Sequence, residues 1–402
     1  MTTGQRTRTV GALGAAQTLA WASSYYLPAM LAVPMARDLG VSAPTVFAAF
    51  SFALVVSALL GPYAGRTIDR WGGRPVLMGT SLVFALGLVM LGCAHGPVTL
   101  FVAWLVLGIG MGSGLYEAAF AALVRLYGHD SRGVITGITL IAGFASTVGW
   151  PLSTVLETQF GWRGACFAWA ALHLVVGLPL NAALPKASTT DAARPTARAS
   201  PEPPPTAPNR AAVVLAFVFA VTWVTSTAMA AHLPGVLMAG GSSLAAAVAI
   251  GALVGPAQVA GRLLEFGLLQ RLHPLLSARL AAAMHPLGAA LLVLIGAPAA
   301  LAFALLHGAG NGILTIAKGT LPLALFGPQG YGQRQGVLMV PARLAQALAP
   351  WLFGLWLNLW GVAALWASAA LGLAAVFALL CLRPAAQPAT GDELPGDAAR
   401  VR

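Results

Sequence analysis

Gly65-Arg66-Thr67-Ile68-Asp69-Arg70-Trp71-Gly72-Gly73-Arg74 is a short charged segment that separates two long apolar runs. Each run has about the twenty residues that a helix needs to cross the roughly 30 Å hydrocarbon core of a bilayer. A charged turn between two such runs is typical of a loop at the membrane surface. The sequence around this loop therefore predicts at least two membrane-spanning helices.

The composition of the whole chain indicates a membrane protein. The 402 residues are 58% hydrophobic and only 8% charged, whereas a soluble domain has about a quarter charged residues. The net charge of +11 does not indicate nucleic-acid binding, because the basic residues are scattered and form no patch with interleaved aromatic residues. Three widely separated cysteines indicate neither a disulfide framework nor a metal site.

Apolar runs of this length recur along the chain, so we expect an all-α polytopic protein of twelve helices. The first run exceeds signal-peptide length and is expected to be retained as a helix. The predicted helices of the first half are 10–36, 44–65, 75–94, 98–126, 133–156 and 164–184. Those of the second half are 211–238, 244–266, 275–296, 298–326, 335–357 and 362–382.

Two polar segments divide the chain. Residues 185–210 contain seven prolines in 26 residues, which is the composition of a disordered linker. Residues 384–402 are polar and are expected to form an unstructured tail. We therefore expect six-helix bundles at 1–184 and 211–383.

The distribution of basic residues predicts the orientation. With both termini in the cytoplasm, only Arg37 and Arg163 of the 22 Lys and Arg residues fall in outer loops. Because cytoplasmic loops retain positive charge, the linker and the tail are expected inside the cell, with the protein in the inner membrane.

The second half repeats features of the first in the same order, as internally duplicated transporters do. The matched stretches are Tyr26-Leu27-Pro28 with His232-Leu233-Pro234, Gly61-Pro62 with Gly255-Pro256, and Gly110, Gly112 and Gly114 with Gly308, Gly310 and Gly312. The repetition predicts two related bundles.

The loop at 65–74 closely resembles the signature loop of the major facilitator superfamily, and Gly161-Trp162-Arg163 is also similar to that family. The resemblance implies a monomeric secondary transporter, without a cofactor, that moves a small molecule by alternating access. It also implies that Gly65, Asp69 and Arg74 stabilise the outward-facing state against the eleventh helix.

The residues of this loop have a physical interpretation of their own. Gly65 allows close helix approach, and Asp69 can pair with Arg70 or Arg74 and face a helix N-terminus. The alternative is that these charges only anchor the topology. Trp104 and Gly149-Trp150-Pro151 depart from the drug-antiporter pattern of the family.

Ionisable residues inside spans are costly, by about 2.5 to 3.5 kcal/mol on insertion scales, so each is a functional candidate. Glu117 could couple protons or contact substrate, or be the structural partner of a basic residue on another helix. Arg343 could bind a carboxylate or phosphate in a bidentate manner, or pair with Glu117. Lys318 could contact substrate or snorkel towards the cytoplasm.

Arg262 has two interpretations. It resembles the substrate-linked arginine that oxalate and monocarboxylate transporters place on the eighth helix. The internal repeat instead aligns it with Arg66 and places Glu265 three residues later, which predicts an internal latch pair.

Polar and aromatic residues near the helix centres are further candidates. His232 could face a central cavity if the helix unwinds near Pro234, or be a packed neutral histidine. Several residues could line a site near the midplane or simply pack between helices: Trp21, Ser24, Tyr25, Tyr26, Trp223 and Ser226.

The preferred function is transport of a small organic anion, with Glu117 as a candidate for proton coupling. The alternative is an efflux carrier for amphipathic drugs or metalloids. A polytopic enzyme or sensor is disfavoured, because no nucleophile motif, metal cluster or phosphate loop is present in the sequence. The expected partners are the bilayer and a small-molecule substrate.

Overall fold

The computed structural model describes residues 3–186 and 210–382. The predicted all-α membrane fold is confirmed, and the described residues contain no strand. The N-terminal helices are α1 (Thr3–Ser23), α2 (Leu27–Asp38), α3 (Ala43–Trp71), α4 (Gly73–Gly92), α5 (Pro97–Gly114), α6 (Tyr116–Tyr127), α7 (Ser131–Ala142), α8 (Ala145–Leu172) and α9 (Leu178–Ala182). The C-terminal helices are α10 (Arg210–Ala239), α11 (Leu244–Ala252), α12 (Val254–Gly267), α13 (Pro274–Ile295), α14 (Ala300–Phe326), α15 (Tyr331–Trp360) and α16 (Leu365–Leu380). Short turns are η1 (Gly128–Asp130), η2 (His173–Gly177), η3 (Leu269–Arg271), η4 (Ala297–Ala299) and η5 (Gly361–Ala364).

Eight helical stretches in the described residues are long and apolar enough to cross a membrane. One of them, Pro97–Ala182, is 86 residues long and covers three predicted helices. Another, Leu352–Leu380, includes the end of the eleventh predicted helix and all of α16. The first predicted helix is absent from these stretches, because α1 is long enough but not apolar enough and α2 has only 12 residues.

Two helices predicted as continuous are broken near their centres. The predicted helix at 10–36 ends at Ser23 and resumes at Leu27, where Pro28 occupies the first turn of α2 and supplies no N–H group. The predicted helix at 98–126 is interrupted at Leu115, whose backbone is extended (φ −82°, ψ −167°). Both predictions of a continuous helix were therefore wrong.

Other boundaries also differ from those predicted. The helix at 133–156 is divided after Ala142, and α8 runs through the predicted loop before 164 with a sharp turn at Gly161 (φ +69°). The helix at 244–266 is divided at Leu253, and α15 is longer than 335–357 at both ends. Nearly all of the predicted linker, and the predicted tail, lie outside the described residues.

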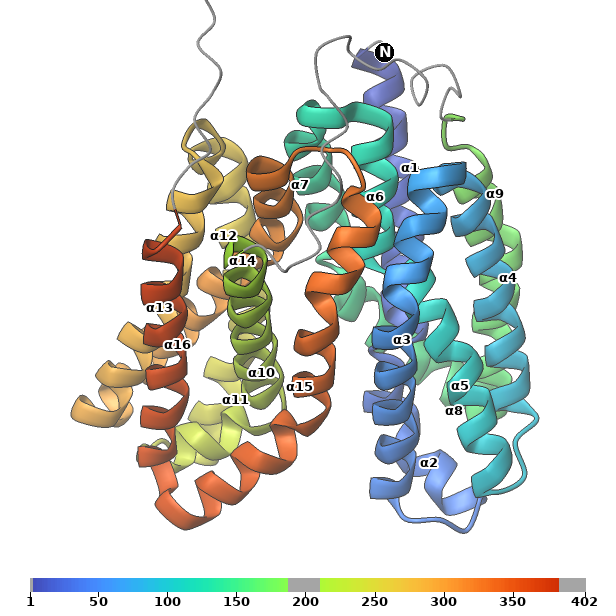
Figure 1. The fold of residues 1–402 in the computed structure, drawn as a ribbon. Helices are drawn as coiled ribbons and strands as arrows, with labels where there is room; N and C mark the ends of the chain where they lie inside the picture. Colours follow the sequence, from blue (N-terminus) through green and yellow to red (C-terminus); the bar gives the residue numbers. More distant parts are fainter. Residues whose placement is uncertain (1–2, 187–209, 383–402) are drawn as a thin grey trace, which may run out of the picture.

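The described helices form two groups that meet along α3 and α15 (Figure 1). Helices α3 and α15 approach each other at the end that holds the N-terminus, and α15 leans away towards the opposite end (Figure 1). We call the end that holds the N-terminus the loop end, because it carries the 65–74 segment. Separate apolar cores lie within the two groups. The interface between the groups is where polar side chains from distant parts of the sequence meet.

Candidate functional site

The interface contains an ion pair between the two halves of the chain. Arg343 on α15 donates to Glu117 Oε2 on α6 at 2.6 Å. The Arg343 side chain is 4% exposed and that of Glu117 is 14% exposed. Of the alternatives left open by the sequence, the structure therefore contains the Glu117–Arg343 pair. In a pair that is so nearly buried, each charge takes the place of the water that the other loses on burial.

The break in the fourth predicted helix positions Glu117. The residue lies in the first turn of α6, where the helix dipole favours a carboxylate. The break frees backbone carbonyls, and Gln17 on α1 donates to the carbonyl of Gly114 at 2.6 Å. Glycines at Gly112 and Gly114 permit close packing of α5 against α3 and α4, since a Cβ at either would collide with its neighbours.

Lys318 lies beside this pair as a second buried cation. Its Nζ lies over the Trp223 ring, 4.1 Å from the centroid, and the residue is 6% exposed. The ammonium therefore lies deep in the protein instead of extending to the loop end, as snorkelling would require. No carboxylate forms a salt bridge with it in the described part of the chain. A cation–π contact stabilises the ammonium but does not neutralise it.

Aromatic residues continue from Trp223 into the N-terminal half. The Tyr25 ring lies 6.4 Å from that of Trp223, and its hydroxyl accepts from Gln346 Nε2 at 2.6 Å. Tyr25 also contacts Trp21 at 5.1 Å and Tyr26 at 5.4 Å between centroids. The predicted aromatic set therefore lies together, beside the ion pair. Ser24 instead donates to the carbonyl of Ala20 in its own segment.

A small cavity lies against the ion pair. Its empty volume is about 210 Å³, including open solvent. Glu117, Arg343 and Met339 line it together with Ser57, Ala58, Gly61, Gly112 and Gly336. The buried Ser57 hydroxyl has no hydrogen-bond partner among the described residues. The pair thus borders space in which a small polar group could bind.

The 65–74 segment contacts the start of α15. Asp69 accepts from the backbone N–H groups of Gly332 and Gln333, each at 2.9 Å. A Cβ at Gly65 would collide with the Gly332 carbonyl, so the two backbones touch. Of the two contacts expected for Asp69, the pairing with Arg70 or Arg74 was wrong, whereas the contact with a helix N-terminus is confirmed. The Asp69 oxygens satisfy free N–H groups of a helix N-terminus, while Arg70 lies over the Trp71 ring.

A second contact at the loop end joins α7 to α12. Arg132 donates to Glu265 Oε1 at 2.7 Å and to the Leu272 carbonyl at 2.6 Å. The predicted internal pair of Arg262 with Glu265 is therefore wrong. Arg262 instead donates to the Thr139 carbonyl across the interface at 3.2 Å. Glu265 points towards the other half because Arg132, the second residue of α7, reaches it there.

Next to this contact, His273 caps the start of α13. Its Nδ1 accepts from the Leu275 N–H at 3.2 Å. Burial, and then the charges of Arg132 and Arg279, lower the pKa of His273 below its usual value of 6.5. A neutral ring is the form that can accept this bond.

His232 does not face the ion pair. Helix α10 continues through Pro234 without unwinding, so the alternative of a cavity-facing ring is not what the structure shows. The His232 ring bonds to the Pro350 carbonyl at 2.7 Å and packs against Phe353. It therefore joins α10 to α15 within the C-terminal half, as a packed histidine.

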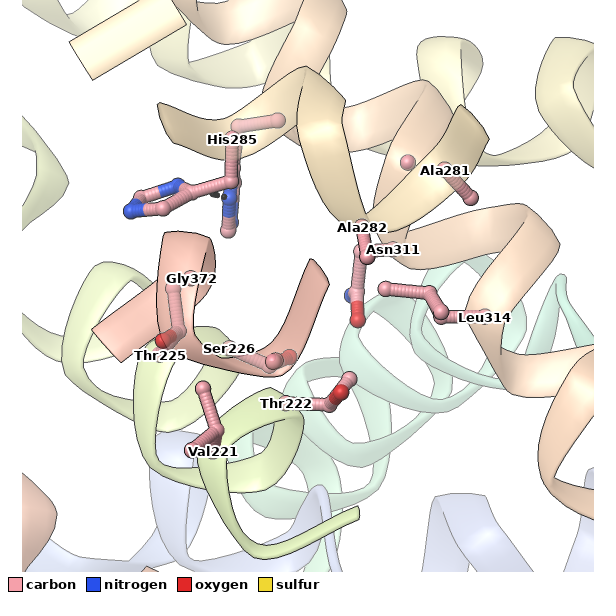
Figure 2. Close-up of a pocket in the computed structure, with 13 residues that line it drawn as sticks. Val221, Thr222, Thr225, Ser226, Ala281, Ala282, His285, Asn311, Leu314 and Gly372 are labelled. Atoms are coloured by element: carbon pink, nitrogen blue, oxygen red, sulfur yellow. Dashed lines mark hydrogen bonds between the residues drawn. The ribbon is translucent and has the colours of Figure 1, made fainter. Parts of the chain in front are cut away.

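A larger polar cavity lies inside the C-terminal half, between α10, α13, α14 and α16 (Figure 2). Its empty volume is about 390 Å³, including open solvent. Thr222, Thr225 and Ser226 line it from α10, opposite Asn311 on α14 (Figure 2). Ser226 therefore belongs to this cavity. All of its residues come from one half, and none of them lines the cavity at the ion pair.

Two histidines in the wall of this cavity form a hydrogen-bonded chain. His285 Nδ1 and His307 Nδ1 are 3.0 Å apart, and His285 Nε2 is 3.0 Å from Ser368 Oγ. With the Ser368 hydroxyl proton on the Leu365 carbonyl at 2.9 Å, Ser368 accepts from His285 Nε2–H. His285 Nδ1 is then unprotonated and accepts from His307 Nδ1–H. In this arrangement His285 carries its proton on Nε2 and His307 carries one on Nδ1.

Several residues of these clusters were not among the candidates that the sequence offered. Gln346 follows Arg343 by three positions, so helical spacing alone could have placed both side chains on one face. Gln17 and Arg132 carry no such signal, because each acts on a residue more than ninety positions away. The histidine pair lies on two different helices, 22 residues apart, and gives no spacing signal.

The sequence of this chain matches that of a known protein family. The sequence profile of the Major Facilitator Superfamily matches residues 13–317. The chain is 29% identical over 148 residues to multidrug resistance protein MdtL of Klebsiella pneumoniae (36% of this chain, 37% of that protein). It is 32% identical over 130 residues to the probable sulfoacetate transporter SauU of Cupriavidus necator (32% and 29%). These matches span well under half of the curated relatives.

Solved structures share the fold over nearly the whole chain. The human organic anion transporter MFSD10 (TETRAN) superposes with a TM-score of 0.65 at 17% identity, covering 94% of this chain and 100% of that one. The transporter FucP in the outward conformation superposes with a TM-score of 0.70 at 12% identity, covering 92% and 97%. At such low identity, these similarities concern the fold alone.

Proposed function

Because this chain belongs to the Major Facilitator Superfamily, we propose that it carries a small organic anion across the inner membrane by alternating access. A transporter rather than an enzyme is what the family and the fold support. Two six-helix bundles, 1–184 and 211–383, would rock about the polar cluster at their interface. Both termini and the linker would lie in the cytoplasm, as the basic residues predict.

The observation that carries the choice of an anion is the charge balance at the interface. Three buried cations, Arg343, Lys318 and Arg262, lie at the interface, and of the carboxylates there Glu117 pairs with Arg343 and Glu265 with Arg132. Glu117 neutralises Arg343, whereas Lys318 contacts a ring and Arg262 a backbone carbonyl. Excess positive charge in a low-dielectric site attracts an anion more strongly than it would in water.

The same pair offers a mechanism for proton coupling. A substrate carboxylate bound at Lys318 would also attract Arg343, and it would compete with Glu117 for the guanidinium. Glu117 would then be a desolvated carboxylate without its partner, and burial would favour its protonated form. One proton would therefore bind Glu117 as one anion binds Arg343, and both would be released when the pair re-forms.

The loop-end contacts fit one state of this cycle. Asp69 and Gly65 join α3 to α15, and Arg132 joins α7 to Glu265 on α12. If the loop end is cytoplasmic, these contacts close the inner side and the structure is the outward-facing state. Gly65, Asp69, Arg132 and Glu265 would then act as the conformational latch.

A binding screen tests the substrate class. Purified protein is heated with organic anions, organic cations and neutral amphipathic compounds, and its melting temperature is measured with and without Lys318→Gln. We expect anions to stabilise the wild type and to lose most of that effect in the variant. Stabilisation by cations or neutral drugs alone would contradict the proposal and favour an efflux carrier.

Proton coupling has a separate test. Glu117→Gln protein in proteoliposomes is given an anion found in that screen, together with an imposed pH gradient. Gradient-driven uptake should be lost while anion exchange without a gradient persists. Full gradient-driven uptake by the variant would remove Glu117 from the coupling role.

A further inference from the structure

The aromatic residues around Lys318 form a continuous surface that the charge balance alone does not explain. From Lys318 the contacts run over Trp223 to Tyr25. From Tyr25 they continue to the rings listed here by their centroid distances: Phe50 at 5.5 Å, Tyr26 at 5.4 Å and Trp21 at 5.1 Å. Trp150 closes the row against Tyr26 at 6.0 Å in an edge-to-face arrangement. One end of this surface is cationic and the rest is aromatic.

These rings do not bury one another completely. Tyr25, Tyr26, Phe50 and Trp223 are only partly buried, and Trp150 is 42% exposed. A structural core would bury such rings, as Trp104 is buried nearby at 0% exposed. Partly exposed rings grouped beside a buried cation present faces on which a ligand ring could stack.

Unused hydrogen-bonding groups point to the chemistry of the ligand. The indole N–H groups of Trp21 and Trp223 are buried and have no acceptor among the described residues. Trp21 is 5% exposed. Together with the Lys318 ammonium, they provide three donors without a carboxylate partner in the described chain. A buried donor without an acceptor is costly, so a ligand that brings acceptor oxygens is favoured.

We propose that the substrate is an aromatic carboxylate, with its carboxylate at Lys318 and its ring against Trp223 and Tyr25. This inference rests on the proposed function and narrows it from organic anions in general to those with a planar ring. Gln346, whose Nε2 holds the Tyr25 hydroxyl, positions that ring, and its buried Oε1 has no partner among the described residues. A hydroxyl or amino group on the substrate ring would find an acceptor there.

Three probes of similar size separate charge from aromaticity: benzoate, cyclohexanecarboxylate and benzamide. Their affinities for the full-length protein in nanodiscs are measured by isothermal titration calorimetry. Benzoate should bind about three- to tenfold more tightly than cyclohexanecarboxylate, because the saturated ring cannot stack. Benzamide should bind most weakly, because it lacks the charge.

Variants identify the residues responsible. Trp223→Leu should abolish the preference for benzoate over cyclohexanecarboxylate, whereas Trp223→Phe, which keeps a ring, should retain most of it. Lys318→Gln should weaken both acids alike and leave their ratio unchanged. Trp366→Leu on α16 is the matched control, since that ring is 45% exposed and belongs to none of these contacts.

The outcomes distinguish this inference from the proposed function. Equal binding of benzoate and cyclohexanecarboxylate, or an unchanged ratio in Trp223→Leu, would overturn the aromatic class while leaving an organic anion in place. Binding of benzamide without binding of either acid would overturn both.

Discussion

Among single residues, Glu117 and Arg343 are those whose substitution should lower the stability of the protein most. Each lies close to full burial, and each has the other as its salt-bridge partner. Removing one member of such a pair leaves an uncompensated charge, whereas removing both leaves only neutral polar groups. The pair is therefore sensitive to single substitutions and tolerant of the double one.

Glu117→Gln or Arg343→Gln alone should each lower stability by about 3 to 5 kcal/mol, and the double variant by clearly less than the sum. Thermal unfolding of the purified variants measures this coupling. Asp38→Asn is the control. Its pair with Arg163 is more exposed, with 35% of the Arg163 side chain and 49% of the Asp38 side chain accessible, and should contribute about 1 kcal/mol or less. Strictly additive losses would show that the two side chains are not coupled.

The histidines of the C-terminal cavity make a spectroscopic prediction at the same scale. The bond from Ser368 to Leu365 requires His285 to carry its proton on Nε2 and His307 on Nδ1. Nitrogen-15 chemical shifts of histidine-labelled protein report both tautomers, and His307→Gln assigns the signals. Two histidines with the same tautomer would contradict the chain.

Among the helices, the decisive features are two breaks and one close crossing. The breaks after Ser23 and at Leu115 place Tyr25 and Glu117 at helix ends near the interface. The crossing of α3 and α15 depends on glycines, because Gly65 and Gly332 bring two backbones into contact. Small residues allow such an approach where lipid provides little hydrophobic drive for helix association.

Gly65→Ala should separate α3 from α15, since the added Cβ meets a backbone carbonyl that cannot move aside. A cysteine introduced at Gln333, in protein whose native cysteines are replaced by serine, should then react several times faster with a membrane-impermeant maleimide. Gly79→Ala in α4 is the matched control, because nothing lies within 4 Å of its added Cβ. An unchanged rate in Gly65→Ala would mean that the crossing does not hold the loop end closed.

At the scale of the whole molecule, two contacts hold the halves together at the loop end. Asp69 binds the start of α15, and Arg132 binds Glu265 on α12. They join two different pairs of helices across the interface, α3 with α15 and α7 with α12. Closure at one end is the condition for access from the other in a rocking mechanism.

Asp69→Asn combined with Glu265→Gln should shift the protein towards the state open at the loop end. Loss of about 1.4 kcal/mol changes the ratio of two states tenfold. Spin labels at Trp71 and Arg271, both exposed, should therefore gain a longer-distance population in pulsed electron resonance. Asp38→Asn, which breaks a pair within one half, should leave the distances unchanged.

The sequence by itself determined the membrane class, the repeated helices and the residue types that would matter, because apolar length, basic loops and buried charges are local properties of the chain. It also placed the aromatic residues and the charges of the site in one list of candidates. It did not predict the breaks at Ser24–Tyr26 and Leu115, since apolar periodicity continues across both.

Only the tertiary structure decided which partner each charge has. Glu117 pairs with Arg343 over 226 positions, Glu265 turns to Arg132 instead of Arg262, and Asp69 caps α15 instead of pairing with its neighbours. The physical reason is that an ionic contact depends on distance in space, which the packing of the two halves sets. Local sequence spacing offers several partners to each charge, and the fold brings only one of them within reach.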